Sequence, residues 1–455
     1  MSEARPAPLS VEELRLLVDS GEIDTVVVAF TDVQGRLQGK RIHAPFFLSD
    51  VLAHGTEGCN YLLAVDIDMN TVEGYAISSW ERGYGDMEFA VDLSTLRRTP
   101  WLPGSVMVQC DLAWLDEKRT PVVESPRQVL QAQMQRAADA GLVAFAGTEL
   151  EFICFDDTFE QAWQAGYRHL RPSNLYNVDY SLLATSRVEP LLRDIRRHMH
   201  AAGLVVESAK GECNLGQQEI AFRYDEVVRT ADNHVAYKNG AKEIAAQHGS
   251  SLTFMAKYDE REGNSCHIHM SVRGTGGEVV FDDGSGPSPL FAHFVAGVQA
   301  TLAELTLLYA PNINSYKRFQ PGSFAPTAIA WGRDNRTCAL RVVGHGAGLR
   351  VENRVPGGDV NPYLALAGML AGGLHGIEHE LPLEPPCEGN AYTSDKQRVP
   401  ATLRAARELF AGSEFAQRTF GQAVVDHYVH AADVEIAAFD AAVTDWERFR
   451  GFERM

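Results

Sequence analysis

The hydrophobic and polar positions of the first 110 residues predict one helix followed by several short strands. Ser10 begins a capping-box pattern before a helix that Gly21 ends. The run TVVVAF at 25–30 is typical of a strand, and the following TDVQGRLQGKRI predicts a hairpin that turns near Gly35. Residues 80–111 carry further strand and turn signals. This part of the chain is therefore expected to be a small β-rich unit.

The second part of the chain alternates helical and strand patterns. Pro126 follows the cap residue Ser125 and opens a helix that ends at Gly141, and VAFAGTELEFICF then predicts a strand. Further helices are predicted at 188–202, at 225–249 and in the apolar segment NPYLALAGMLAGGLHGIE. Further strands are predicted at 204–208 and in SLTFMAKY and CHIHMSVR. This alternation indicates an α/β or α+β fold.

Length, charge and composition narrow the class of protein. A chain of 455 residues is too long for one ordinary core, so two domains are expected, or one large domain with a smaller partner. The net charge of -19 argues against nucleic acid as a partner, because binding it needs a basic surface. The longest mostly apolar stretch, LALAGMLAGGL, is too short to span a membrane. Seven cysteines without a CxxC motif, and an N-terminus without an apolar core, indicate reduced thiols in the cytoplasm.

Two glutamates on one predicted strand form the first candidate site. Glu149 and Glu151 stand two residues apart and share one strand face, while Leu150 and Phe152 face the core. A solvated strand face is the simpler interpretation, but the apolar flanks VAFAG and FICF disfavour full exposure. Two like charges on a half-buried strand need a positive partner between them.

Two further stretches add carboxylates and histidines. In KGECNLGQQE a turn near Gly216 would bring Glu212 and Glu219 together, although surface loops often contain glutamates. In CHIHMS, His267 and His269 share a strand face by the same period-two rule. A lone histidine is more often a core residue than a ligand, whereas two on one face make both interpretations equally good. A zinc pair with the cysteine before His267 is disfavoured, because adjacent strand residues face opposite ways.

An arginine-rich segment completes the unusual charge pattern. Its five arginines are Arg318, Arg336, Arg341, Arg350 and Arg354. Arginines in an acidic protein suit bidentate recognition of carboxylate and phosphate. Arg350, Glu352 and Arg354 alternate and so share one strand face. Surface ion pairing explains these arginines less well, because they stand among apolar strand residues.

Together these stretches offer five glutamates and a histidine beside an arginine cluster. Hard oxygen ligands with few nitrogens favour Mg²⁺ or Mn²⁺ over Zn²⁺. Metal ions and arginines around a phosphate are the shared means of phosphoryl transfer. The chain has no GxxxxGK[ST] phosphate loop, and GTGGE at 274–278 is interpreted as a turn between strands. A metal-dependent hydrolase is the rival enzyme class, disfavoured by the arginine cluster and by the lack of an HExxH motif.

Six stretches, in order along the chain, resemble the glutamine synthetase family: ELE, ECNLGQQE, GNSCHIHMS, NSYKRFQPG, NRTCALR and RVENRVPGGDVNPYLALA. Residues 1–9 are expected to be a disordered leader. The resemblance implies an α+β fold with a small N-terminal β-grasp domain, here 10–112. It also implies a large catalytic α/β domain with a curved antiparallel sheet, here 120–455. The implied assembly is a dodecamer of two hexameric rings with each active site between neighbouring subunits.

The same resemblance implies a reaction. ATP enters one end of a funnel and glutamate the other, and the glutamate γ-carboxylate attacks the γ-phosphate to give γ-glutamyl phosphate. An amine then displaces phosphate and forms an amide. Two or three Mg²⁺ or Mn²⁺ ions per site assist this chemistry.

Each matching position has an implied role. One metal site is implied for Glu151, Glu212 and Glu219, and a second, on the ATP phosphates, for Glu149, His267 and Glu352. Glutamate contacts are implied for His269, Arg318 and Arg354. The arginine on the transferring phosphoryl group is Arg336, which with Arg354 forms the implied catalytic pair. Nucleotide contacts are implied for Tyr224, Ser271, Arg341 and Arg350.

The chain departs from the ammonia-using members of the family at one subsite. Those members carry a flap glutamate shortly after the KR..PG motif, where this chain has Phe324 in PGSFAP. They also carry an Asp-Gly-Ser-Ser loop, and no such tetrapeptide occurs between residues 45 and 85. A phenylalanine removes a partner for ammonium and supplies an apolar wall, which suits an amine with a carbon body. A γ-glutamyl-amine ligase is therefore expected.

The identity of the amine stays open. A polyamine needs carboxylates for its distal ammonium, and Asp66 and Asp68 are candidates if their segment faces a neighbouring subunit's active site. A small amino alcohol such as ethanolamine needs only a hydroxyl partner and a short pocket. The alternatives are a glutamine synthetase with a different ammonium site and a non-catalytic family member.

Overall fold

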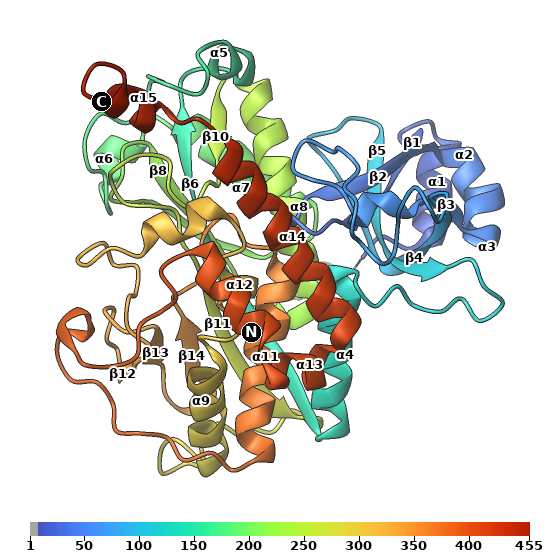
Figure 1. Ribbon diagram of the computed structural model, residues 1–455. Coiled ribbons are helices and arrows are strands. Elements are labelled where there is room, and N and C mark those ends of the chain that lie inside the picture. Colours follow the sequence, from blue (N-terminus) through green and yellow to red (C-terminus); the bar gives the residue numbers. More distant parts are fainter. Residues whose placement is uncertain (1–7) are drawn as a thin grey trace.

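The computed structural model describes residues 8–455, so most of the predicted leader lies outside the described part of the chain. The backbone N–H of Leu9 donates to the carbonyl of Leu96 at 2.9 Å, so the end of the predicted leader is hydrogen-bonded to the smaller unit. Two sheets and two large hydrophobic cores organise the described residues. In Figure 1 the smaller sheet, in blue, lies to one side of the larger part of the molecule.

The smaller sheet has five strands in the order β2-β1-β5-β4-β3. Their bounds are β1 Thr25–Thr31, β2 Leu37–His43, β3 Thr56–Cys59, β4 Asp86–Arg98 and β5 Ser105–Trp114. β1 pairs antiparallel with β2 and parallel with β5, so the predicted hairpin is confirmed. A Cβ at Gly39 would lie 1.9 Å from the Val28 carbonyl oxygen, so this close pairing of β1 and β2 requires glycine.

Short helices cover this sheet. They are α1 Val11–Asp19, α2 Ala44–Phe46, the π-helix η1 Phe47–Val51, α3 Leu52–His54 and the 3₁₀ helix η2 Asn60–Leu63. Ser10 and Glu13 form the predicted capping box at the start of α1. Leu14 and Phe47 bury their side chains in one core with Val26 and Val28 of β1. A mixed sheet packed against helices is the arrangement expected of a β-grasp unit.

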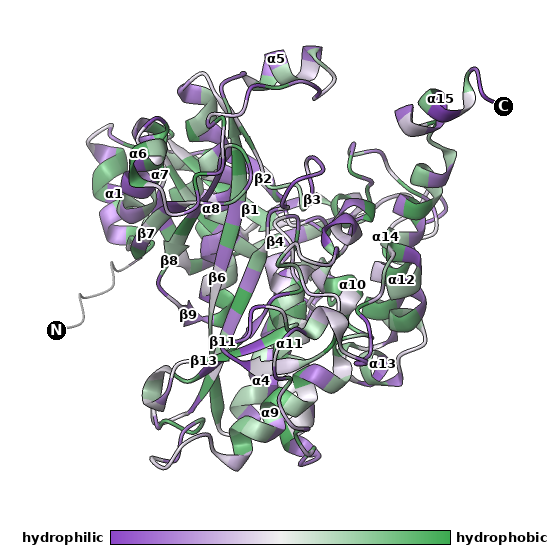
Figure 2. Cartoon of the chain, turned by 90° about the vertical axis from the view of Figure 1, so that its left-hand side faces the viewer, coloured by the Kyte–Doolittle hydropathy of each residue, from purple (hydrophilic) through white to green (hydrophobic). Residues whose placement is uncertain are grey.

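The larger sheet has nine strands, and seven of them form the path β12-β13-β14-β11-β6-β8-β7. Their bounds are β6 Leu142–Phe155, β7 Val206–Gly211, β8 Gln217–Phe222, β9 Asp225–Glu226, β10 Ser251–Thr253, β11 Cys266–Gly274, β12 Trp331–Arg333, β13 Leu340–Val343 and β14 Arg350–Asn353. All pairings are antiparallel except β12 with β13, as the predicted antiparallel sheet requires. Figure 2 shows hydrophilic and hydrophobic residues in alternating bands along β6 and β11, so one face of each strand is polar.

Helices pack against the apolar face of this sheet and against one another. Their bounds are α4 Pro126–Asp139, α5 Phe159–Gln164, α6 Leu182–Thr185, α7 Glu189–Ala201, α8 Val227–Gln247, α9 Pro289–Thr301, α10 Thr306–Tyr309, α11 Pro362–Glu378, α12 Leu403–Ala411, α13 Glu414–Phe420, α14 Gln422–Ala441 and α15 Asp445–Gly451. Three further 3₁₀ helices are η3 Ile313–Arg318, η4 Gly346–Gly348 and η5 Ala391–Thr393. The core includes Leu150 and Phe152 of β6 and Cys266 of β11, so these residues face inward as predicted. The α+β fold class is thereby confirmed.

The structure corrects two local predictions. The strand predicted for SLTFMAKY is only Ser251–Thr253. The backbone N–H of Lys257 donates to Asn314 Oδ1 at 2.8 Å, a side-chain partner that replaces strand pairing there. Ser125 occupies the cap position of α4 in an extended conformation, but its side chain makes no capping hydrogen bond. Among the described helices, none is both long enough and apolar enough to cross a membrane.

Candidate active site

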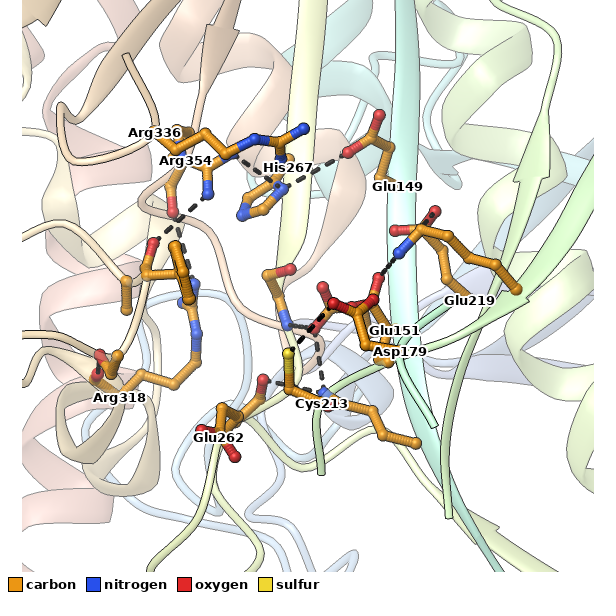
Figure 3. Close-up of a pocket in the computed structure, with 18 of the residues that line it drawn as sticks. Glu149, Glu151, Asp179, Cys213, Glu219, Glu262, His267, Arg318, Arg336 and Arg354 are labelled. Atoms are coloured by element: carbon orange, nitrogen blue, oxygen red, sulfur yellow. Dashed lines mark hydrogen bonds and ion pairs between the residues drawn. The ribbon is translucent and has the colours of Figure 1, made fainter. Parts of the chain in front are cut away.

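A cavity of about 360 Å³ lies over the polar face of the larger sheet. It brings together ten of the residues predicted from the sequence: Glu149, Glu151, Glu212, Glu219, His267, Arg318, Phe324, Arg336, Arg341 and Arg354. Figure 3 shows Arg318, Arg336 and Arg354 on one side of this cavity and Glu151, Glu219 and Asp179 on the other, with His267 between them. The cavity therefore has a cationic wall and an anionic wall.

Strand register explains why these side chains converge. His267 of β11 is paired with Glu149 of β6, and Glu219 of β8 is paired with Glu151 of β6. Glu352 of β14 is paired with His269 on β11 and with Arg341 on β13. Directly opposed residues on one sheet face bring their side chains into contact range. Five neighbouring strands thus carry the charged residues to one place.

Glu151, Glu212 and Glu219 form the first carboxylate cluster. One oxygen from each lies within 4.8 Å of the others. Burial, together with the negative charges of Glu149, Glu151 and Glu352, raises the pKa of Glu219 to about 8 despite nearby Lys210. A divalent cation bound by hard oxygen ligands would relieve this repulsion. The donor set therefore fits Mg²⁺ or Mn²⁺.

Glu151 is held in place by neighbouring donors. Its Oε2 atom accepts from Gln217 Nε2 at 3.1 Å and from the Ser265 backbone N–H at 2.7 Å. Lys210 pairs with Glu212, and its Nζ atom lies 4.0 Å from Oε1 of Glu219. One lysine supplies only part of the positive charge that three carboxylates require.

Glu149, His267 and Glu352 form the second cluster. The Nδ1 atom of His267 lies 3.4 Å from Oε2 of Glu149 and 3.4 Å from Oε1 of Glu352. Burial alone would raise the pKa of Glu352, but His267, Arg354 and His269 lower it to about 2. Burial and the charge of Arg354 lower the pKa of His267, which favours the neutral imidazole that a metal ion needs. One ligand atom each of Glu149, His269 and Glu352 lies within 4.8 Å of the others, so the two carboxylates fit a divalent cation with His269 as the nearby nitrogen donor, and the part of His267 as a ligand stays a prediction.

The arginines on the opposite wall are firmly anchored. Buried Arg354 pairs with Glu352 through Nη1, and its Nη2 donates to the carbonyl of Phe324 at 3.4 Å. Buried Arg318 donates from Nη1 to the carbonyl of Val355 at 2.9 Å. Arg341 donates from Nη1 to Oε2 of Glu352 at 2.9 Å. These contacts fix the guanidinium groups in advance, as recognition of carboxylate or phosphate requires.

His269 lies outside the cavity lining. Its Nδ1 accepts from Nε of Arg350 at 3.2 Å, so its Nε2 carries the proton and donates to Oε1 of Glu149 at 2.9 Å. Its ring thus links the second cluster to Arg350 and makes no contact with Arg318 or Arg354 among the hydrogen bonds of the described chain. The predicted contact between His269 and glutamate stays a prediction that these contacts do not support.

Of the four residues predicted to contact the nucleotide, Arg341 lines the cavity, whereas Tyr224, Ser271 and Arg350 lie outside its lining. Ser271 is paired with Phe145 across β11 and β6, and the Tyr224 ring meets the Phe145 ring edge-on with centroids 6.2 Å apart. Ser271 therefore lies further along β11 than His267 and His269, on the side of Arg350, and Tyr224, between β8 and β9, lies beside the same part of β6. This order agrees with a nucleotide at one end of the site and glutamate at the other.

Asp66 and Asp68 do not line the cavity of their own chain. Asp66 accepts from the backbone N–H groups of Asp68 at 3.0 Å and Asn70 at 2.8 Å, which closes a local turn in the smaller unit. Any role in the amine pocket therefore depends on a neighbouring subunit.

Sequence reasoning missed several residues that line the cavity. They are Asp179, Tyr180, Lys210, Cys213, Gln217, Glu262 and Ser265. Lys210, Cys213 and Gln217 lie inside the KGECNLGQQE motif that marks Glu212 and Glu219, and this proximity was the available signal. Asp179 and Tyr180 lie in an irregular segment, where no periodic pattern predicts which way a side chain points.

A largely antiparallel sheet whose polar face carries two carboxylate clusters beside buried arginines defines a glutamine-synthetase-type fold and site. Residues 123–450 match the family model described as glutamine synthetase, catalytic domain. The chain belongs to the glutamine synthetase family.

Three similar proteins place the chain within this family. It is 65% identical to gamma-glutamylethanolamide synthetase GlnA4 of Streptomyces coelicolor, covering 99% of this chain and 97% of that protein. It is 36% identical to glutamate–isopropylamine ligase of a Pseudomonas species, covering 96% and 97%. A solved structure described as a GmaS/ADP complex superposes with a TM-score of 0.84 at 25% identity, covering 97% and 99%.

Proposed function

We propose that this protein is an ATP-dependent ligase that joins glutamate to an amine through the γ-carboxylate. The observation that carries the proposal is the cavity itself, in which two carboxylate clusters face three arginines and Phe324. In the first step a γ-carboxylate oxygen of glutamate attacks the γ-phosphorus of ATP and ADP leaves. In the second step the amine nitrogen attacks the acyl phosphate, inorganic phosphate leaves and one amine proton is released.

Arginine geometry supports the first step. Arg318 and Arg354 are buried at the cavity wall, and Arg336 is exposed there. We assign Arg318 and Arg354 to the carboxylates of glutamate and Arg336 to the phosphoryl group in transfer. Arginine binds both groups through paired N–H donors. Arg341 and Arg350, with Tyr224 and Ser271, are assigned to ATP.

The carboxylate clusters support a requirement for divalent metal ions. We assign one ion to Glu151, Glu212 and Glu219 and a second to Glu149, His267 and Glu352, with Mg²⁺ or Mn²⁺ as the metal and two or three ions per site. Bound there, such ions would neutralise the phosphate charge that builds up during transfer. The protein's own part is to hold these oxygen ligands in register on neighbouring strands.

Ethanolamine is the amine that we propose. The relative with 65% identity is a gamma-glutamylethanolamide synthetase, and a more distant relative of 36% identity is an isopropylamine ligase. Phe324 lines the cavity and has φ of 58°, a left-handed conformation that sets the direction of its ring. Its apolar surface suits the carbon body of a small amine better than ammonium.

We also propose a dodecamer of two hexameric rings with active sites between subunits, in the cytoplasm. Leu182 and Leu183 are 86% and 84% exposed in the single chain, and Trp446 and Phe449 of α15 are also exposed. Such large exposed apolar residues favour burial against another copy. All seven cysteines are free, which supports a reducing compartment.

An ADP-release assay tests the proposed function. Purified protein would be given ATP, Mg²⁺ and glutamate with ammonia, ethanolamine, putrescine, spermidine or simple alkylamines. We expect ADP release that needs glutamate and a metal ion and is fastest with ethanolamine. Faster turnover with ammonia than with every amine would identify a glutamine synthetase instead. No ADP release under any condition would identify a non-catalytic member of the family.

A further inference from the structure

Asp179 and Cys213 form a polar pair in the cavity wall that no assigned role uses. The two residues line the cavity together with Phe324. The Cys213 thiol donates to Oδ2 of Asp179 at 3.6 Å, a contact drawn in Figure 3. One ligand atom each of Asp179, Glu212 and Cys213 lies within 4.8 Å of the others. The pair therefore lies beside the first carboxylate cluster, where glutamate is activated.

The segment that carries Asp179 is docked firmly against β7. The backbone N–H of Tyr180 donates to the carbonyl of Gly211 at 3.3 Å, and that of Asp179 donates to Asn177 Oδ1 at 2.9 Å. A Cβ at Gly211 would lie 2.5 Å from the Val178 carbonyl oxygen, so only glycine permits this approach. Because Gly211 directly precedes Glu212, the docking sets Asp179 in place relative to the first cluster.

The nearby cation is already engaged elsewhere. Lys210 pairs with Glu212, and its Nζ atom lies 4.9 Å from the centre of the Tyr180 ring. Among residues 8–455, no lysine or arginine forms an ion pair with Asp179. A carboxylate that faces a cavity without a cationic partner can accept a hydrogen bond from a small polar molecule.

The other parts of the cavity limit what that molecule can be. Phe324 supplies an apolar surface and is 57% exposed toward solvent and the cavity. The cavity, of about 360 Å³, must also hold the side chain of glutamate. The combination suits a small amine with a polar end.

We propose that Asp179, supported by Cys213, recognises the hydroxyl of a short amino alcohol whose carbon chain packs against Phe324. The inference rests on the proposed ligase function and adds a residue that determines its specificity. The hydroxyl donates to the Asp179 carboxylate while the amine nitrogen is left free to attack the activated γ-carboxyl. An alkylamine of equal length lacks this donor and leaves the carboxylate without a partner.

The test compares two amines of matched length in two variants. Ethanolamine and propylamine, which carries a methyl group in place of the hydroxyl, would be assayed with the wild type, Asp179→Ala and Asp179→Asn. Loss of a hydrogen bond to a substrate hydroxyl lowers kcat/KM about ten-fold or more, so we expect that loss for ethanolamine in Asp179→Ala and little change for propylamine. Asp179→Asn keeps an acceptor oxygen and should retain part of the preference. Glu260→Ala, at an exposed carboxylate outside the cavity lining, is the matched control.

Several results would overturn the inference. An equal loss for both amines would assign Asp179 a structural role, and a loss confined to putrescine would assign it to a distal ammonium group. A raised Mg²⁺ requirement in Asp179→Asn, with the ethanolamine preference intact, would make Asp179 a metal ligand. A wild type that releases no ADP with glutamate, Mg²⁺ and any of the amines would overturn the proposed function itself, and that result precedes any comparison of variants.

Cys213 supplies a second, independent variant of the same test. Cys213→Ser keeps a donor to Asp179 and should preserve the preference for ethanolamine over propylamine. Cys213→Val removes the donor and should reduce that preference, with unchanged KM for ATP. A preference that is identical in both variants would remove Cys213 from the proposal.

Discussion

The imidazole of His269 donates from Nε2 to Oε1 of Glu149 at 2.9 Å. His267 reaches the other oxygen of the same carboxylate, with Nδ1 at 3.4 Å from Oε2. Burial would raise the pKa of Glu149, but the two histidines lower it well below its usual range. One carboxylate thus contacts two histidines that have different other neighbours. His267 also lies beside Glu352 and Arg354, whereas His269 also accepts from Arg350.

The two histidines are expected to give different kinetic defects. His267→Ala removes the nitrogen ligand that we propose for the second metal site and should raise the apparent Mg²⁺ requirement about ten-fold or more. His269→Ala leaves Arg350 unsupported, so we expect a raised KM for ATP with little change in KM for glutamate. Initial-rate kinetics with each substrate varied in turn would measure both. A His269→Ala enzyme with a raised KM for glutamate alone would restore the prediction made from the sequence.

Glu219→Gln should stabilise the metal-free protein. In the wild type the folded-state pKa of Glu219 is about 8, above the ordinary carboxyl value of 4.5, because of burial and its acidic neighbours. The folded state therefore holds a proton that the unfolded state has lost, and stability falls as pH rises from 4.5 to 8. Thermal unfolding in EDTA at pH 6 and pH 8 should show this loss in the wild type and not in Glu219→Gln. Added Mg²⁺ should stabilise the wild type far more than the variant. Equal Mg²⁺ stabilisation of both would remove Glu219 from the metal site.

Arg127 of α4 should be essential for stability. Its guanidinium contacts Asp232 of α8 at 3.0 Å, Asp111 of β5 at 2.5 Å and Asp92 of β4 at 2.6 Å. These contacts link the smaller sheet to helices of the larger unit. Removing one partner of a buried ionic network leaves unpaired charge and costs about 3–5 kcal/mol. We expect that loss for Arg127→Leu in urea unfolding. Arg136→Ala, on the same helix but paired with exposed Glu378, is the control and should cost about 0–1 kcal/mol.

His427 should make the contact between α14 and the smaller unit sensitive to acid. Burial and the nearby His430 lower the pKa of His427 from 6.5 to about 3, and its ring packs 4.8 Å from that of Tyr75. Below pH 6.5 His427 is protonated in the unfolded state but stays neutral in the folded state. The folded state therefore loses stability progressively as pH falls from 6.5 toward 3. Unfolding of the wild type at pH 7 and pH 5 should show this loss, by up to about 1.4 kcal/mol per pH unit. His427→Gln should show a smaller pH dependence, and an unchanged dependence would contradict the assignment.

Phe324→Glu should shift the preference for the attacking nucleophile. The variant places a carboxylate where ammonia-using members of the family carry one, and removes the apolar surface that suits an alkyl chain. We expect the ratio of ammonia to ethanolamine turnover to rise at least several-fold. Phe324→Leu keeps an apolar side chain and is the control. If the ratio of ammonia to ethanolamine turnover in Phe324→Glu equals that of the wild type, Phe324 does not select the nucleophile.

Period-two patterns within strands predicted much of the site. Glu149 and Glu151 share the polar face of β6, and buried Leu150 and Phe152 share the other face, as the alternation indicated. The capping box of α1 and the buried helix α11 were equally predictable, because both depend on residues close together in the sequence.

Contacts between distant segments were not predictable in the same way. The position of His269 depends on where Arg350 returns on β14, 81 residues further along the chain. The position of Asp179 depends on how closely the segment around Val178 approaches Gly211. No local sequence pattern predicts this approach. Long-range register and loop docking are properties of the folded chain as a whole, so a single sequence constrains them weakly.

The residues that we propose activate glutamate and those that we propose select the amine belong to different kinds of structure. The carboxylate clusters sit mainly on paired strands, whereas Asp179 and Phe324 sit on connecting segments outside every strand. A substitution or insertion in those segments alters what is attached to the activated carboxyl without shifting any strand pairing. New preferences for the attacking amine can therefore arise in this architecture through changes in loops alone. The strands that carry the groups proposed to activate glutamate with ATP would stay as they are.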